Sequence, residues 1–261
     1  MLTLGWAGTE QGKMFLRRIA CRMVAAALWL RSKRLSPDRI NRVLVIAPHP
    51  DDETFGCGGA LAMLARANTS PKIIFVTDGS ASHLGHALKS REDIAAMRRE
   101  EARSAASVLG VDRSHVTFLS EPDGGLDRLA PDPIRSLTCR IASLILDEKP
   151  GAIFLPCRND GSSEHEAVFA IVRGAVEQTE LSPRILEFPV WSWWNSSLLA
   201  QSIVTSRRVW RVEMGGIGAV KARAIACYAS QLRPIPPDIH AALPDGFASI
   251  FLGRYEFLLE H

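Results

Sequence analysis

Four ionisable side chains lie close together in the sequence near residue 50. His49, Asp51, Asp52 and Glu53 follow the apolar run 43–47, which reads VLVIA. An imidazole and a carboxylate three residues apart, as in His49 and Asp52, can reach one divalent ion across a tight turn, and zinc takes nitrogen and oxygen ligands of this kind. Asp51 stands between them, free to accept a proton from a water on that ion. A helix cap would need only one oxygen, so three carboxylates with a histidine favour a metal site.

The neighbouring residues indicate where this motif lies in a fold. The run 43–47 is uncharged and rich in β-branched residues, which predicts a strand buried on both faces. Pro48 and Pro50 end that strand, because neither can donate to a β-ladder. In α/β proteins the carboxyl edge of the sheet is where sites are found. The glycines of 56–59 would let the next helix begin close against the sheet.

Downstream of the motif, apolar runs alternate with helical patterns. This rhythm predicts parallel β-α-β units joined by right-handed crossovers. We therefore expect an α/β fold, a Rossmann-like three-layer domain with a mostly parallel sheet, over residues 41–261. The expected strands are 43–47, 72–77, 115–119, 152–156, 184–190 and 204–214. The expected helices are 57–67, 90–109, 132–147, 165–179 and 219–232.

Residues 1–40 are predicted to form a separate, basic and amphipathic N-terminal segment. Within residues 13–36 there are seven Lys or Arg side chains and no acid. The apolar residues that recur there at helical spacing are Phe15, Leu16, Ile19, Met23, Ala26, Ala27 and Leu30. The uncharged run is too short to span a bilayer, which takes ~20 apolar residues. Two interpretations stay open: a helix lying on an anionic membrane surface, or a helix packed on the domain with a solvated basic face.

The overall composition excludes several classes of protein. Of the 261 residues, 47% are hydrophobic and 23% are charged, as in an ordinary soluble protein. A formal net charge of +3 is too small to indicate nucleic-acid binding, and no nucleic-acid-binding motif occurs, so we expect no nucleic-acid partner. The five cysteines are widely spaced and form no CxxC pair, which favours reduced thiols in a cytoplasmic protein. The N-terminal segment would add membrane association if it binds lipid.

The residue sequence of the motif is more specific than the spacing of its ionisable side chains. PHPDDE at 48–53 resembles the signature of the PIG-L and LmbE-like deacetylases, which include the GlcNAc-phosphatidylinositol de-N-acetylases and the mycothiol- and bacillithiol-pathway deacetylases. The resemblance runs over most of the chain. Other similar stretches are VTDGS at 76–80, MRREEA at 97–102, FLSEPDGGL at 118–126, IFLPCRNDGSSEHEAV at 153–168 and KARAIACYASQ at 221–231.

This resemblance implies roles for individual residues. Carried over by position, it implies that His49, Asp52 and His165 bind zinc, or another divalent metal, and that Asp51 is the general base. One departure concerns the general acid. The family usually has an HPDH-type motif where this chain reads SSEH at 162–165, so the final histidine is kept and the first is replaced by serine. Because that first histidine is often cast as an acid or oxyanion stabiliser, the identity of the acid stays open.

Further residues are expected near the substrate or around the metal, although Asp78, His83, His86, Arg98 and Asp123 also have an ordinary interpretation as turn or surface residues. These weaker candidates are Glu53, Asp78, His83, His86, Arg98, Asp123, Ser162 and Glu164. His83, His86 and Glu164 are the candidates for the missing acid. The alternative is that Asp51, once protonated, delivers the proton to the leaving amine. The aromatic cluster of 188–194 is expected mainly in the core, with one tryptophan at the rim of the pocket.

The motif and the resemblance together predict a zinc-dependent hydrolase. It would remove the N-acetyl group from an N-acetylglucosamine-type sugar or glycoconjugate, with a small-molecule or lipid-linked amino sugar as substrate. Two alternatives remain open: a metal-dependent amidase acting on a non-sugar substrate, and a non-catalytic relative that binds metal or glycan. Acetate release separates the enzymes from the binding protein, and comparing N-acetyl sugars with other amides separates the two enzymes.

Overall fold

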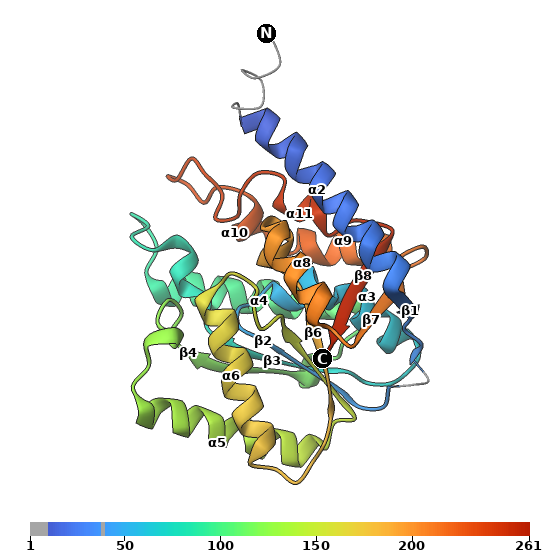
Figure 1. Ribbon diagram of the computed structural model, residues 1–261. Helices are drawn as coiled ribbons and strands as arrows, with labels where there is room; N and C mark the ends of the chain where they lie inside the picture. Colours follow the sequence, from blue (N-terminus) through green and yellow to red (C-terminus); the bar gives the residue numbers. More distant parts are fainter. Residues whose placement is uncertain (1–9, 38–39) are drawn as a thin grey trace.

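The computed structural model describes residues 10–37 and 40–261; residues 1–9 and 38–39 of the predicted N-terminal segment lie outside the described part. An eight-stranded sheet runs through the molecule in the order β1-β7-β8-β6-β5-β2-β3-β4 (Figure 1). The strands are β1 Ser32–Arg34, β2 Val43–Ala47, β3 Lys72–Thr77, β4 Val116–Glu121, β5 Ala152–Pro156, β6 Arg184–Phe188, β7 Arg208–Glu213 and β8 Tyr255–Glu260.

The sheet is mostly parallel, as predicted. Only β8, among the described strands, runs antiparallel to its neighbours β6 and β7. β2 pairs with β3 on one side and with β5 on the other, so the strand order reverses between β2 and β5. Loops that leave the carboxyl ends of strands at such a reversal diverge and leave a crevice, where α/β proteins bind their ligands. The turn after β2 carries the PHPDDE motif.

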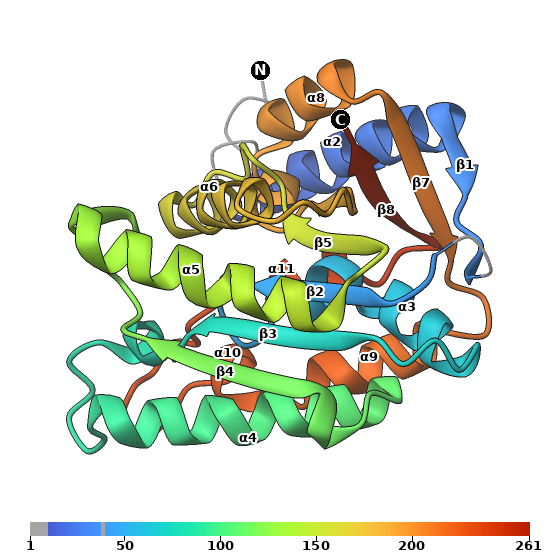
Figure 2. The same ribbon diagram turned by 90° about the horizontal axis from the view of Figure 1, so that it is seen from below.

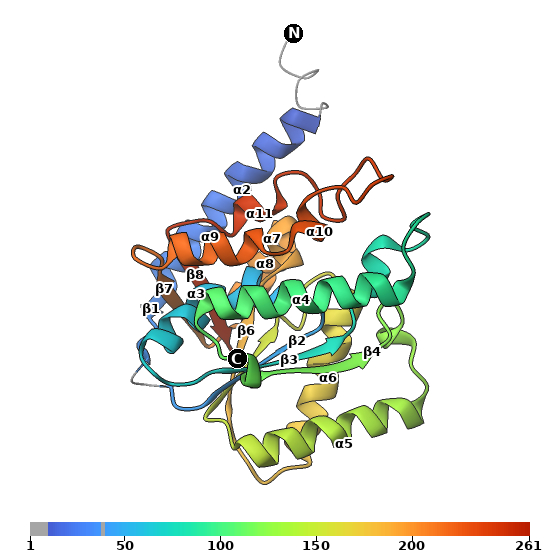
Figure 3. The same ribbon diagram turned by 180° about the vertical axis from the view of Figure 1, so that it is seen from behind.

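Helices cover both faces of the sheet, which confirms the three-layer prediction. Figure 3 shows α3 (Asp52–Arg66), α4 (Arg91–Leu109) and α9 (Gly218–Ala226) on one side, with α5 (Pro131–Glu148) and α6 (Ser163–Glu177) on the other. Alternate residues of β2 belong to two different hydrophobic cores, one on each face of the sheet. Val43, Val45 and Ala47 join the cluster under α3 and α4, whereas Leu44 and Ile46 join the cluster under α5 and α6. Burial on both faces explains why β2 reads as an unbroken apolar run.

The glycines after the motif allow close approach of helix and sheet, as predicted. A Cβ on Gly56 would lie 2.1 Å from the Phe188 ring, and one on Gly59 would lie 2.5 Å from the Met214 sulfur. The helix nevertheless begins at Asp52, earlier than the expected residue 57, and bends at Cys57, where the backbone is non-helical. Asp52 and Glu53 therefore belong to the first turn of α3 rather than to a preceding loop, and Asp51 is the residue just before the helix.

The C-terminal third differs most from the expected pattern. The strand expected at 204–214 is shorter, because residues 204 and 205 end α8, so β7 covers only Arg208–Glu213. The helix expected at 219–232 is divided into α9 and α10. It breaks near Tyr228, whose backbone is non-helical and whose hydroxyl donates to the buried Glu53 at 2.6 Å. This tertiary contact overrides local helix propensity.

The remaining short elements connect the layers. They are η2 Ser80–His83, η3 Arg113–His115, η4 Leu126–Arg128, α7 Trp191–Trp194, α8 Ser196–Thr205, α10 Ala229–Leu232 and α11 Phe247–Ile250.

The N-terminal segment forms a long helix followed by an edge strand. α2 (Glu10–Arg31) lies along α8 and β7, and β1 pairs in parallel with β7 at the edge of the sheet (Figure 2). Among the described residues, no helix is both long enough and apolar enough to cross a membrane. β1 belongs to the same sheet as β2, the strand that precedes the motif. Part of the basic segment is therefore integrated into the α/β architecture. A domain boundary at residue 40 stays a prediction.

Candidate metal and active site

The loops at the carboxyl ends of β2, β4 and β5 meet at one cavity of about 540 Å³. The motif residues line its floor, and side chains from α4, α6, α7 and the C-terminal segment form its walls. The described lining residues that bear on the chemistry are His49, Asp51, Asp52, Arg98, Asp123, Ser162, Glu164, Trp191, Gln231 and Phe247.

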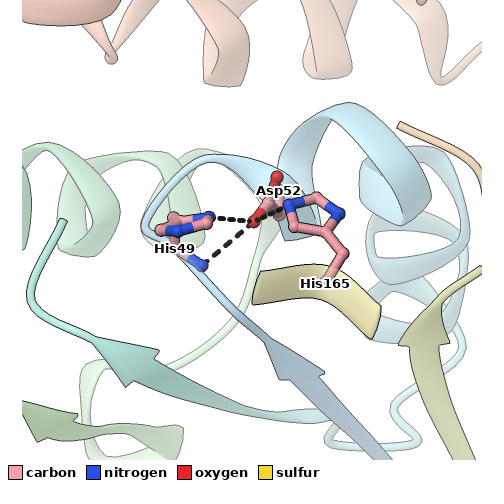
Figure 4. Close-up of side chains that lie close together, drawn as sticks. All are labelled: His49, Asp52 and His165. Carbon is pink, nitrogen blue, oxygen red and sulfur yellow. Dashed lines mark hydrogen bonds and ion pairs between the residues drawn. The ribbon is translucent and has the colours of Figure 1, made fainter. Parts of the chain in front are cut away.

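Three predicted metal ligands lie side by side at the floor of this cavity (Figure 4). The Oδ2 atom of Asp52 lies 3.0 Å from Nδ1 of His49 and 3.2 Å from Nε2 of His165. The backbone N–H of His49 also donates to this oxygen at 3.0 Å, which fixes the tight turn. Burial alone would raise the pKa of Asp52, but the charge of the neighbouring His165 imidazole and the hydrogen bond and charge of His49 hold it below its usual range. Asp52 is therefore a carboxylate.

The environment of His165 fits a metal ligand. The ring is completely buried, and its Nε2 makes no hydrogen bond with a described residue although it points at the Asp52 carboxylate. Its Nδ1 lies 2.8 Å from Oδ2 of Asp160. A carboxylate that accepts from one ring nitrogen leaves the lone pair of the other nitrogen available for a metal. Two imidazoles and one carboxylate form the ligand set of many catalytic zinc sites.

Asp160 was not predicted from the sequence as a site residue. Its carboxylate accepts from the backbone N–H groups of Val190, Trp191 and Ser192 at 2.9 to 3.0 Å, in addition to holding His165. These donors come from a loop about thirty residues later in the chain, so no local pattern reveals the contact. Asp160 thus ties the β5 and β6 loops together beneath the histidine.

Two further carboxylates approach the other nitrogen of His49. Its Nε2 lies 2.9 Å from Oε2 of Glu164 and 3.3 Å from Oδ1 of Asp123. The other oxygen of Glu164 accepts from the backbone N–H groups of the 124–126 loop at 2.9 to 3.1 Å. His49, Asp123 and Glu164 could by spacing also hold a cation. Because they share His49 with the first set, we interpret the two carboxylates as the groups that orient its ring.

Asp51 belongs to neither set of potential ligands, yet it lines the same cavity. Its carboxylate lies 2.9 Å from a guanidinium nitrogen of Arg98, which also donates to the carbonyls of Pro50 and Gly79. Burial raises the pKa of Asp51 to about 8, although the Arg98 charge opposes this shift. Its φ of 132° is strained for a residue with a Cβ, and such strain is often found at functional positions.

Comparison with known proteins places these residues in a family context. The family model described as PIG-L, GlcNAc-PI de-N-acetylase, matches residues 44–176. The match covers 133 of the 261 residues, slightly more than half of the chain, and includes the motif and His165. The chain belongs to the PIG-L family.

Two of the proteins that are similar to this chain are described as deacetylases. The diacetylchitobiose deacetylase of Thermococcus kodakarensis is 28% identical over 117 residues, which is 45% of this chain and 41% of that protein. The alignment therefore spans less than half of the relative's length. Among solved structures, N,N'-diacetylchitobiose deacetylase from Pyrococcus horikoshii matches with a TM-score of 0.62 and 19% identity, covering 86% of this chain and 85% of that one.

A third relative performs different chemistry on a similar fold. GalB, the 4-carboxy-2-hydroxymuconate hydratase from Pseudomonas putida KT2440, matches with a TM-score of 0.62 and 18% identity, covering 81% of this chain and 82% of that one. At such identities the likeness shows the fold alone. Activity in this PIG-L family member must therefore be argued from its own site residues.

The structure places several weaker candidates away from the cavity. Glu53 points into the core, where Tyr228 donates to one oxygen and the backbone N–H of Asp51 to the other, and burial raises its pKa to about 7. Asp78 accepts from the backbone of Ser80 and of Asp123, so it shapes the loop that carries Asp123. We interpret Glu53 and Asp78 as residues that fix the backbone of the site.

The two loop histidines also lie outside the described lining of the cavity. His83 is buried against Ser82, and burial lowers its pKa. His86 lies 3.2 Å from the carbonyl of Ile235 through Nε2, while its Nδ1 accepts from the backbone of Leu88. Ser162, in contrast, does line the cavity. The structure thus brings the serine to the site and leaves both histidines beside it.

One aromatic wall completes the cavity. Trp191 lies at its edge and packs against Phe247 with ring centroids 4.9 Å apart, whereas Phe188 is completely buried. Trp193 and Trp194 are partly buried against the core clusters. Phe247 comes from a C-terminal segment in which the sequence offered no signal for the site.

Replacing Asp160 by asparagine should weaken metal binding by about 10- to 100-fold, the usual cost of losing a carboxylate behind a ligand histidine. The change removes the charge that holds the Nδ1 proton of His165 but keeps the side-chain volume. Titration of the metal-free protein with zinc in the presence of a competing chelator measures the effect. Ser192→Ala is the matched control, since it removes a hydrogen bond to Asp160 at 2.7 Å without touching His165. Equal zinc affinity of wild type and Asp160→Asn would contradict this role.

Proposed function

We propose that the chain is a metal-dependent N-deacetylase that hydrolyses the acetamido group of an N-acetylglucosamine-type sugar. The observation that carries the proposal is the position of Asp51: a buried carboxylate, outside both sets of potential ligands, that lines the same cavity as they do. Membership of the PIG-L family supports the reaction class. Zinc is the proposed metal, held by His49, Asp52 and His165, because two imidazoles and a carboxylate suit it; another divalent ion is the alternative.

The metal would supply Lewis-acid chemistry, lowering the pKa of a water and polarising the acetyl carbonyl. The chain's own contribution begins with Asp51, which as a carboxylate accepts the proton of the attacking water. The buried guanidinium of Arg98 holds that carboxylate in place through an ion pair. The water oxygen bonds to the carbonyl carbon, the C–N bond breaks, and the products are acetate and the free amine.

The leaving amine must receive a proton, and Asp51 is also the proposed donor. Ser162 reaches the cavity, but a hydroxyl has too high a pKa to deliver a proton near neutral pH. Glu164 accepts from three backbone N–H groups through one oxygen and contacts His49 through the other, so both oxygens are already engaged. Both loop histidines lie outside the described lining. Protonated Asp51 therefore supplies the proton that it took from water.

The cavity is suited to a small polar substrate with one flat hydrophobic face. Its volume of about 540 Å³ accommodates a sugar residue, and Trp191 beside Phe247 offers an aromatic surface on which a sugar ring can stack. We propose a small-molecule or lipid-linked amino sugar as the substrate class. All five cysteines are free, which is consistent with the cytoplasm as the proposed compartment.

Acetate release from a panel of substrates tests this function. The purified, zinc-loaded protein should release acetate from at least one of free, nucleotide-linked or lipid-linked N-acetylglucosamine compounds, and not from simple aliphatic acetamides. Release from the acetamides alone would support the amidase alternative. Metal and glycan binding without acetate release from any compound would support the non-catalytic relative.

A further inference from the structure

The N-terminal helix α2 docks on the domain through a narrow stripe. Leu28 is completely buried in a small cluster with α8 and the β7–β8 strands, and the Cys21 thiol donates to the carbonyl of Trp193 at 3.3 Å. Near the end of the helix, Arg31 donates to the carbonyls of Ile203 and Ser206. These contacts fix the rotation of the helix about its own axis and decide which face it presents outward.

The face turned outward is the apolar stripe that was predicted from the sequence. Leu16, Ile19, Met23 and Leu30 are 50%, 40%, 69% and 76% exposed. With 3.6 residues per turn these four positions lie along one side of the helix. A helix packed on the domain by its amphipathic face would have buried this stripe. The structure instead buries a different stripe and leaves the large apolar side chains exposed.

A groove of about 780 Å³ opens beside this stripe, between α2 and the segment that joins α11 to β8. It is larger than the catalytic cavity and is lined by aromatic and aliphatic side chains, with three arginines at its rim. The described lining residues are Arg18, Cys21, Arg22, Ala25, Ala26, Trp29, Trp193, Ser249, Ile250, Leu252, Gly253, Arg254, Tyr255 and Phe257.

The charge around the groove has one sign. Arg18, Arg22 and Arg254 line it, no acidic residue does so among the described lining, and none of the three arginines forms an ion pair with a described residue. The chain contains no acid between residues 11 and 37. Exposed apolar side chains flanked by unpaired arginines complement a surface that is apolar inside and anionic outside.

The groove lies next to the catalytic cavity. Two short helices, α7 and α11, take part in both: Trp191 and Phe247 face the cavity, whereas Trp193 and Ile250 face the groove. α2 extends beyond the body of the molecule on the same side as α10 and α11 (Figures 1 and 3). A surface that meets the groove would therefore lie beside the wall that α7 and α11 form for the catalytic cavity.

We propose that the exposed apolar stripe of α2, called the outer stripe and formed by Leu16, Ile19, Met23 and Leu30, makes a docking surface for an anionic phospholipid bilayer together with the adjoining groove. An acyl chain occupies the groove, the outer stripe enters the interface, and Arg18, Arg22 and Arg254 contact lipid phosphates. A second copy of this chain is a poorer occupant, because a symmetric contact through the groove would bring these arginines against one another, and no acid occurs among the described lining residues. The proposal concerns lipid binding and does not depend on the deacetylase activity.

Vesicle sedimentation of the full chain tests the proposal. Vesicles with 30 mol% phosphatidylglycerol in phosphatidylcholine should pellet the protein, and pure phosphatidylcholine vesicles should pellet much less. Removing three arginines in Arg18→Ala/Arg22→Ala/Arg254→Ala should weaken binding on the order of 10- to 100-fold, since each basic side chain at such a surface contributes several-fold.

A matched charge control separates a defined surface from diffuse attraction. Arg113→Ala/Arg135→Ala/Arg173→Ala changes the net charge by the same amount, and its residues are exposed on η3, α5 and α6, away from α2. This control should bind like wild type. Equal loss in both triple variants, or equal pelleting by neutral and anionic vesicles, overturns the proposal. A wild-type melting temperature in each variant shows that the fold is retained.

The apolar half of the surface has its own test. Leu16→Gln/Met23→Gln/Leu30→Gln, which keeps helix-forming residues at exposed positions, should abolish pelleting, whereas Leu146→Gln on α5 should not. Vesicles with brominated acyl chains should quench tryptophan fluorescence, and Trp29→Phe should reduce that quenching. Pelleting with no difference in quenching between wild type and Trp29→Phe overturns occupation of the groove. A dimer that binds no vesicles would assign the surface to a second copy instead.

Discussion

Asp51→Asn should lower turnover by about 10²- to 10⁴-fold, the usual cost of removing a general base, while the purified protein keeps its metal. Asparagine has nearly the same volume as aspartate but cannot accept a proton from water. Because Asp51 belongs to neither set of potential ligands, its replacement leaves His49, Asp52 and His165 in place. Acetate release and metal content, measured on the same preparation, check the two halves of this expectation.

The dependence of the rate on pH adds a second readout. A base must be deprotonated to act, so turnover should fall as the pH drops through the pKa of Asp51. Burial raises that pKa in the metal-free protein, and a nearby cation would lower it again. The pH at which turnover falls, the acidic limb of the pH–rate profile, therefore reports on metal loading. The residual activity of Asp51→Asn should lose this acidic limb, and Asp51→Glu should retain it. Loss of the metal in Asp51→Asn would instead make Asp51 a ligand.

The parts of this fold that sequence could predict are those specified by local pattern. β2 is buried on both faces, so its residues are apolar without interruption, and its end is marked by proline and by carboxylates. The next helix needs glycine where its backbone meets Phe188. Each of these signals lies within about fifteen residues of the motif. The β-α-β rhythm then predicts a parallel sheet. The pairing of β2 with β5, which brings their carboxyl ends together, is seen only in the structure.

The parts that sequence could not predict depend on contacts between distant segments. Asp160 is recognisable only through backbone donors some thirty residues later. Glu164 stands next to His165 in sequence, yet its function as the partner of His49 depends on amides from the β4 loop. The two interpretations of α2 were equally compatible with its amphipathic pattern. Only the rotation imposed by Leu28 and Cys21 shows which face remains exposed.

His165→Ala should remove most of the bound metal and, with it, most of the activity. The imidazole is completely buried, its Nε2 makes no hydrogen bond with a described residue, and its Nδ1 is held by Asp160, so the ring cannot be replaced by a neighbouring side chain. Since loss of a partner behind a ligand costs about 10- to 100-fold in affinity, loss of the ligand itself should cost more. Elemental analysis after dialysis against a weak chelator measures the loss.

His115→Ala provides the matched control for this last variant. His115 lies in η3, at the start of β4 and distant from the carboxyl edge of the sheet, so its loss should change neither metal content nor turnover. Excess zinc should restore part of the activity of His165→Ala if His49 and Asp52 still hold the ion weakly. His165→Ala with a full complement of metal and wild-type turnover would show that the ion binds elsewhere. The set formed by His49, Asp123 and Glu164 would then become the metal site to test next.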